Sequence, residues 1–389
     1  MKKKKLLFIL VVFIIALVFL PVMGTASAES LEDNIDEQLG NLDLSGIEDY
    51  VNSLTEEEQG VFSNGFLAVV KDILNGNAQY SVGDVFQVFF RSVIEEFKLL
   101  VPHFAIILAI AVLCTIVSSA RANFLSESIK EMVFYVCIIA VIVILAADFG
   151  ALVENSKNTI QKLTNLSQIM LPVIITLMIA GGGTASAALY KPAVAFLTNG
   201  ISGIFLNVLI PVVGLTVVFS VLSSLSSSFK LNNTQSFLHG LIKWLIGLSV
   251  TVFAFFMTAQ GLSSAVIDGV SFRAAKYAIT NSIPLVGGLL KDGFDLVLAG
   301  TVLIKNAVGL SAVFLIFSII LQPVIHLLVF QLTLKLFAAL AEPVSDGRIS
   351  ALLASVSKSV SYLLAIVLAI GLMMFISFLL LIISANAFI

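Results

Sequence analysis

Residues 363–384 read LLAIVLAIGLMMFISFLLLIIS, an apolar run without a single charged side chain. This run has the length of about 20 residues that a helix needs to cross about 30 Å of hydrocarbon. Shorter apolar runs at 104–117 and 132–147 belong to the same pattern, which continues from Pro102 to the C-terminus with few charges in its breaks. Because hydrocarbon offers backbone groups no water, these runs must form helices. The sequence therefore predicts an all-α, polytopic membrane protein.

Composition and charge divide the chain into two parts. Hydrophobic residues make up 59% and charged residues 12% of the sequence, against about a quarter charged in soluble domains. The net charge is −3, but residues 29–100 alone hold fifteen acidic and three basic side chains, a net of −12. We therefore predict a solvated, helical, extracytoplasmic region at 29–100 and a membrane domain at 101–389.

The first 28 residues have the features of an export signal. Lys2–Lys5 form a cationic start, residues 6–20 are apolar, and Ala26-Ser27-Ala28 resembles a cleavage site. We predict cleavage after Ala28; the alternative is an uncleaved membrane anchor. Cleavage leaves the mature N-terminus, and with it residues 29–100, outside the cytoplasm.

Two capping boxes are predicted in the exported region. Ser45 with Glu48, and Thr55 with Glu58, have the spacing at which a hydroxyl and a carboxylate satisfy free amides at a helix start. After Thr55, apolar residues at helical spacing predict one helix that ends at Asn75-Gly76-Asn77. The acidic residues before Thr55 are interpreted as a solvated, partly mobile lead; the alternative is a ligand site.

The membrane domain is predicted to contain about seven transmembrane helices. Their approximate ranges are 102–120, 132–152, 167–189, 193–228, 237–262, 307–340 and 359–386. The fourth and sixth are long and contain Pro211 and Pro323, so each is either a kinked helix or a hairpin. With the N-terminus outside, seven Lys and Arg residues fall in cytoplasmic loops and five outside, a weak bias that places 263–306 in the cytoplasm.

The segment 258–306 carries an unusual number of charges for such an apolar region. One interpretation is a pair of interfacial amphipathic helices. The other is a re-entrant element, broken at Pro284 and lining a water-filled cavity. The sequence GGGTASAA at 181–188 predicts either close helix packing or a local unwinding of the backbone.

Motifs of the common enzyme classes are missing from the sequence. It has no Walker A loop, no HExxH and no paired-cysteine zinc spacing. We therefore expect no enzyme activity, no cofactor and no nucleic-acid partner. His326 lies in an apolar run, where a proton or substrate contact is one possible role.

Several motifs between residues 260 and 309 resemble the stage III sporulation protein AE family. They are Gln260-Gly261, Ser264-Ala265-Val266, Asp268-Gly269, Arg273, Ala275-Lys276, Ile283-Pro284, Gly287, Asp292, Asp295 and Leu303–Gly309. The resemblance runs from about residue 55 to the C-terminus, and the 260–309 block is its specific part. No catalytic residue follows from it.

The resemblance implies a membrane subunit of a mother-cell-to-forespore channel or secretion-like complex, required for endospore formation and late forespore gene expression. It implies a place in the mother-cell membrane around the forespore. Implied partners are other membrane and intermembrane-space proteins of the complex, including a cytoplasmic ATPase and ring-forming proteins. The alternative function is an independent secondary transporter for a small solute. The residues expected to line a pore or contact a subunit are Gln260, Asp268, Arg273, Lys276, Pro284, Asp292, Asp295, Lys305 and Asn306.

Overall fold

The computed structural model describes residues 28–77, 82–119, 127–225, 231–282, 287–343 and 347–384, without the side chains of 28–33, 82–86, 88, 118, 119, 127, 130, 232, 260–282 and 287–295. The chain divides into two units, residues 1–41 and residues 42–389. Of the first unit, the structure describes helix α2 (Ala28–Gly40), which starts where cleavage is predicted. The predicted signal at 1–28 otherwise lies outside the described residues.

Residues 42–77, here called the docked segment, form the first part of the second unit. They contain α3 (Ser45–Asn52), α4 (Glu56–Gln59), the 3₁₀ turn η1 (Gly60–Phe62) and α5 (Phe66–Leu74). Val51, Phe62 and Phe66 are almost completely buried. Two predictions fail here. Residues 45–52 form a packed helix rather than a mobile lead, and the helix predicted after Thr55 is interrupted at 63–65, although it does end at Asn75.

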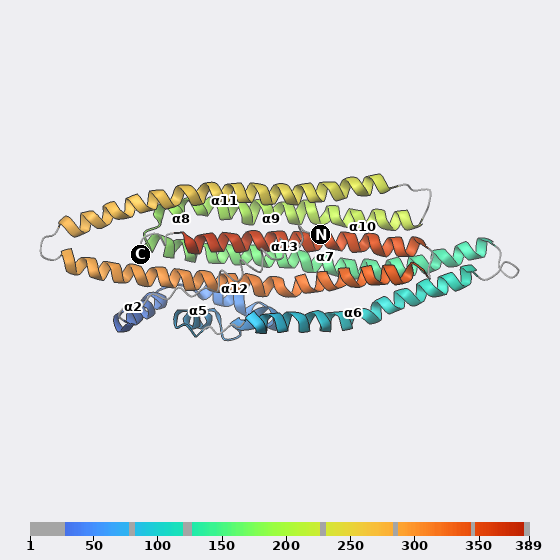
Figure 1. The fold of residues 1–389 in the computed structure, drawn as a ribbon, viewed down its shortest axis with the longest axis horizontal. Coiled ribbons are helices and arrows are strands. Elements are labelled where there is room, and N and C mark those ends of the chain that lie inside the picture. The colour runs from blue at the N-terminus through green and yellow to red at the C-terminus, as the bar shows by residue number, and fades with distance from the viewer. Residues whose placement is uncertain are drawn as a thin grey trace. The chain divides into compact units, whose positions relative to one another are not determined.

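Six long apolar helices of the second unit run side by side (Figure 1). Their bounds are α6 (Val82–Ser119), α7 (Glu127–Ala180), a rod from Thr184 to Leu225, α11 (Asn232–Ser282), α12 (Gly287–Ala341) and α13 (Gly347–Ile383). The described residues contain no strand, and each of these helices is long and apolar enough to cross a membrane. The prediction of an all-α, polytopic membrane protein is confirmed.

The rod from Thr184 to Leu225 is a single helical pass built from five pieces. They are α8 (Thr184–Ala195), the π-helical η2 (Phe196–Ile201), α9 (Ser202–Ile204), the π-helical η3 (Phe205–Leu209) and α10 (Ile210–Leu225). The proline at 192 removes one amide from the helical ladder shortly before the π-helical turns begin. Pro211 lies in the first turn of α10, and Pro323 lies inside α12. Neither proline opens a hairpin.

Helix α7 differs from the prediction most clearly. Separate spans were predicted at 132–152 and 167–189, with a polar loop between them. The structure instead has one unbroken helix of 54 residues, about 81 Å long, which ends at Ala180. The chain reverses at Gly181–Gly183, where Gly182 has a φ of +86°. The glycine stretch thus does unwind the backbone, whereas the polar segment 153–168 does not.

The bundle of long helices has two ends, named here after one residue each. At the Ser355 end lie the C-terminal ends of α6, α10 and α12 and the N-terminal ends of α7, α11 and α13 (Figure 1). Ser355 there shares a 2.6 Å hydrogen bond with Ser220, and the Arg348 guanidinium lies 3.6 Å from the Phe134 ring centre. At the Lys305 end, Lys305 of α12 donates to the carbonyl oxygen of Ser384, just after α13.

Candidate functional site

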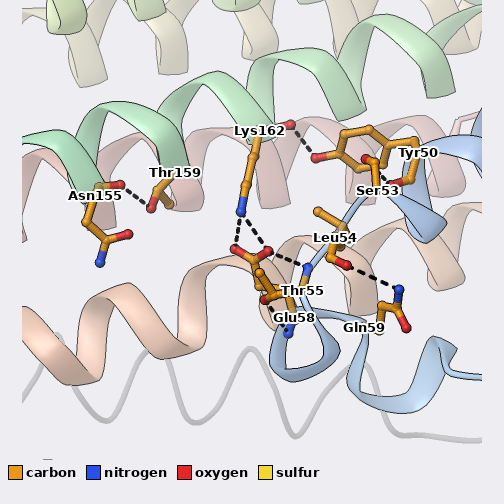
Figure 2. A network of polar contacts seen from close by, with 9 residues as sticks. All are labelled: Tyr50, Ser53, Leu54, Thr55, Glu58, Gln59, Asn155, Thr159 and Lys162. Carbon is orange, nitrogen blue, oxygen red and sulfur yellow. Dashed lines mark hydrogen bonds and ion pairs between the residues drawn. The ribbon is translucent and has the colours of Figure 1, made fainter.

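A network of polar contacts fastens the docked segment to α7 (Figure 2). The Lys162 ammonium of α7 donates to both carboxylate oxygens of Glu58, each at 2.6 Å. Glu58 is buried, and its carboxylate also accepts the backbone amide of Thr55 at 3.2 Å. The Thr55 hydroxyl accepts the Glu58 amide in return, so the predicted capping box at Thr55 is confirmed. One carboxylate therefore both caps α4 and binds α7.

Tyr50 makes a second link between α3 and α7. Its hydroxyl donates to the carbonyl oxygen of Lys162 at 2.7 Å. Burial, and after it the nearby Glu58 carboxylate, raises the pKa of Tyr50 above its ordinary value. The phenol therefore stays protonated and keeps its donor proton at physiological pH.

The predicted capping box at Ser45 is wrong. Ser45 is the first residue of α3, and its hydroxyl donates to Asp43 at 2.5 Å instead. This bond and a second one from the Ser45 amide lower the pKa of Asp43. Glu48 caps a different helix, because its two carboxylate oxygens accept the amides of Phe66 and Leu67 at the start of α5.

An acid–histidine pair joins α6 to α12 inside the apolar helices. Glu96 is 8% exposed, and its carboxylate lies 2.5 Å from Nδ1 of His326. Asp148 of α7 interacts electrostatically with His326 and with His103 of α6. Ionisable side chains within membrane helices are costly, and by default they indicate a functional position. The prediction named His326 but missed its partner, because Glu96 lies before the first span expected from the sequence.

Hydroxyl groups link α10 to α13 near the Ser355 end. Thr216 shares a 2.8 Å hydrogen bond with Ser359, one turn from the Ser220–Ser355 bond. Gln235 of α11 donates to Ser220 at 3.3 Å. Such polar links between apolar helices stabilise packing by about 1 kcal/mol each or less. We therefore interpret this row as a structural seam.

Two residues of the predicted site, Lys305 and Asn306, lie in the described part of α12. Lys305 is 1% exposed, and its ammonium is held by the Ser384 carbonyl oxygen, so it lies within the bundle. The Oδ1 atom of Asn306 is buried and has no hydrogen-bond partner among the described residues. Lys305 is thus buried, whereas the Asn306 side chain is partly exposed.

The other predicted site residues are placed only through their backbones. Gln260, Asp268, Arg273 and Lys276 belong to the last part of α11. Asp292 and Asp295 belong to the first turns of α12, and Pro284 lies outside the described residues. The two helices are neighbours (Figure 1). The predicted block is therefore the hairpin end of α11 and α12, and the structure describes its side chains only from Leu296 onward.

Metal chemistry finds no support in the described part of the chain, where no group of three His, Cys, Asp or Glu side chains is placed to hold a metal ion. The described polar groups hold the docked segment on α7 and place an acid–histidine pair between α6 and α12.

Comparison with known proteins gives the family. The profile of the stage III sporulation protein AE family matches residues 65–385, most of the chain. The chain belongs to this family. The resemblance seen in the sequence is thereby confirmed.

One curated member is the stage III sporulation protein AE of Bacillus subtilis (strain 168). It is 26% identical to this chain over 397 aligned positions, which cover 99% of this chain and 98% of that protein. No solved structure matches the chain. The matched region of the stage III sporulation protein AE family includes all nine predicted site residues as well as Glu96, Lys162 and His326. Membership in this family, together with the six apolar helices, makes the chain a multi-pass membrane protein of a sporulation family.

Proposed function

We propose that this protein is a membrane subunit of a mother-cell-to-forespore channel or secretion-like complex, required for endospore formation and late forespore gene expression. The observation that carries the proposal is family membership over residues 65–385. The six apolar helices support it because a conduit subunit must be anchored in a bilayer. In this proposal the chain is located in the mother-cell membrane surrounding the forespore and is not an enzyme.

The proposed partners are other proteins of the same complex. They include a cytoplasmic ATPase and ring-forming proteins of the intermembrane space. The chain has no nucleotide-binding loop, so an energy source must come from a partner or from a gradient. The 260–309 block, with Asp268 and Arg273 as its leading residues, is proposed as the pore or subunit contact.

A second candidate is an independent secondary transporter, and one observation favours it. The Glu96–His326 pair lies between helices with apolar runs, which is where transporters keep groups that bind protons or substrates. A transporter would perform its task as an isolated chain, whereas a conduit subunit needs its partners.

Affinity purification separates the two candidates. The full chain carries a C-terminal tag, is expressed from its own promoter in sporulating cells, and is extracted in mild detergent. A tagged membrane protein without a sporulation role is the control. Recovery of a cytoplasmic ATPase and exported proteins with this chain, but not with the control, supports the complex subunit. A chain recovered alone that moves a solute in purified vesicles overturns that proposal in favour of the transporter.

A further inference from the structure

Because α7 is continuous, fewer passes separate the two ends of the chain than the sequence suggests. Five spans were predicted between residues 100 and 263, an odd number that places 263–306 on the opposite side from the docked segment. The structure has four passes there: α6, α7, the rod 184–225 and α11. Four is even, so the hairpin end of α11 and α12 returns to the side of the docked segment.

The docked segment limits where the bilayer can lie along the axes of the helices. It is fastened to α7 at Lys162, and a Cβ atom at Gly60 would lie 3.5 Å from Ser318 of α12. It exposes the charged residues Asp43, Asp49, Glu56, Glu57, Lys71 and Asp72. Charges cost several kcal/mol each in hydrocarbon, so the level of Lys162 and Ser318 must be in water.

Helix lengths decide on which side of this level the bilayer lies. Toward the Lys305 end, α7 has only the residues from Ile169 to Ala180 after its polar segment, about 18 Å of helix. That is too short for a core of about 30 Å. Toward the Ser355 end, the same helix has the residues from Met132 to Leu152 before its polar segment, about 31 Å, and this length does fit.

The exposed side chains also favour a bilayer around the Ser355 half of the bundle. The large apolar residues that are exposed on α6, α7 and α11 there have no cover within the described chain; they include Leu113, Ile116, Met132, Val136 and Trp244. On the other half, the rod alternates exposed apolar side chains with exposed Thr184, Lys191 and Asn199. Lipid tails fit the first surface and not the second.

From this geometry we infer that the bilayer surrounds only the Ser355 half of the bundle. The Lys305 half stands outside it, and the hairpin end of α11 and α12 projects on the same side as the docked segment. The earlier expectation of a cytoplasmic 263–306 segment is replaced by this placement. A contact made by the 260–309 block is then with a partner on the exported side. This placement does not depend on the proposed role in sporulation.

Thiol labelling tests the sidedness. Three single-cysteine variants, Ser63→Cys, Ser282→Cys and Ser128→Cys, are made in the full chain with Cys114→Ser and Cys137→Ser. They report on the docked segment, the end of α11 and the Ser355 end. An impermeant maleimide on intact cells should label Ser63→Cys and Ser282→Cys, and should label Ser128→Cys only after permeabilisation. If the maleimide labels only one of Ser63→Cys and Ser282→Cys on intact cells, the inference is overturned. The same holds if Ser282→Cys is not labelled after permeabilisation.

Fluorescence quenching tests the lipid boundary, because Trp244 is the one tryptophan of the chain. It is 62% exposed on α11, 12 residues from the helix start at the Ser355 end. Its counterpart is Phe196, which is 42% exposed and lies 12 residues into the rod from the Lys305 end. In vesicles of brominated phosphatidylcholine, Trp244 emission should fall at least twofold. A Phe196→Trp variant with Trp244→Phe should keep its emission. Equal quenching of both would show that lipid covers both halves, against the inference.

Discussion

The Lys162 ammonium donates to both oxygens of the Glu58 carboxylate, although 104 residues separate the two in the sequence. This ion pair ties the part of the chain that precedes the membrane helices to the polar middle of α7 (Figure 2). It also requires Lys162 and the docked segment to lie on the same side of a bilayer. A contact that fastens a small segment thus fixes a level of the whole bundle relative to the membrane.

Replacing Lys162 by methionine should loosen the docked segment. The variant keeps most of the apolar stem but leaves the buried Glu58 carboxylate without its ammonium donor. A hydrogen bond to a charged group contributes about 1.5–3 kcal/mol, and we expect a loss at the lower end because Lys162 is partly exposed. Hydrogen exchange in α3–α5 of the detergent-solubilised chain should become several-fold faster. Lys157→Met on the same helix is the control, since Lys157 forms no ion pair with a described residue. Equal exchange in the two variants would contradict the docking role.

Replacing Glu96 by alanine should destabilise the bundle much more than replacing its neighbour Glu95. Glu96 is buried against His326, whereas the Glu95 side chain is 58% exposed and pairs with Arg91 on the same helix. Loss of the buried partner should cost about 1–3 kcal/mol, while an exposed pair contributes about 0.3–0.5 kcal/mol. Thermal unfolding in detergent compares the two variants. If Glu96→Ala unfolds at the temperature of Glu95→Ala, the pair makes no structural contribution.

The architecture followed from the sequence because long apolar runs permit little else in hydrocarbon. Helix α7 was misread because a polar stretch usually marks a loop. Residues 151–171 contain neither Gly nor Pro, however, and Leu152, Ile160, Leu163, Leu166 and Met170 recur at helical spacing as a buried face. That periodicity was present in the sequence and predicts a continuous amphipathic helix.

Polar contacts between residues far apart in the sequence were harder to predict. Thr55 and Glu58 cap their own helix, and a local spacing rule finds them. Glu48 obeys the same rule but caps α5, because the chain turns back at residues 63–65 and presents two free amides to it. The partners of Glu58 and Glu96 are Lys162 and His326, and only the packing of the helices brings them together. Single-sequence patterns carry no information about such pairs.

Gly309→Ala should destabilise the contact between α12 and α13. A Cβ atom at residue 309 would lie 2.4 Å from Cγ1 of Ile382, and this atom is too close to the backbone to move away freely. Overpacking of this kind costs about 1–3 kcal/mol. Gly214→Ala is the matched control, because a Cβ there has no neighbour within 4 Å. Thermal unfolding in detergent should show a lower midpoint for Gly309→Ala alone. If Gly309→Ala is as stable as Gly214→Ala, the two helices are farther apart than described.

Changing Asp268 or Arg273 to alanine should block spore formation if the 260–309 block is the working part of the proposed complex. Both residues lie on the last part of α11, which the inferred placement puts outside the bilayer on the exported side, where a partner can contact it. If that part of the helix only rests at an interface, each exposed charge contributes about 0–1 kcal/mol and its loss should change little. Heat-resistant spores are counted beside the membrane level of each variant. We expect at least a tenfold loss of spores at normal protein level. Deletion of residues 31–41, which belong to the separate N-terminal unit, should leave sporulation intact. Normal sporulation in both point variants, with a defect in the deletion, would move the functional assignment from the hairpin end of α11 and α12 to the N-terminal unit.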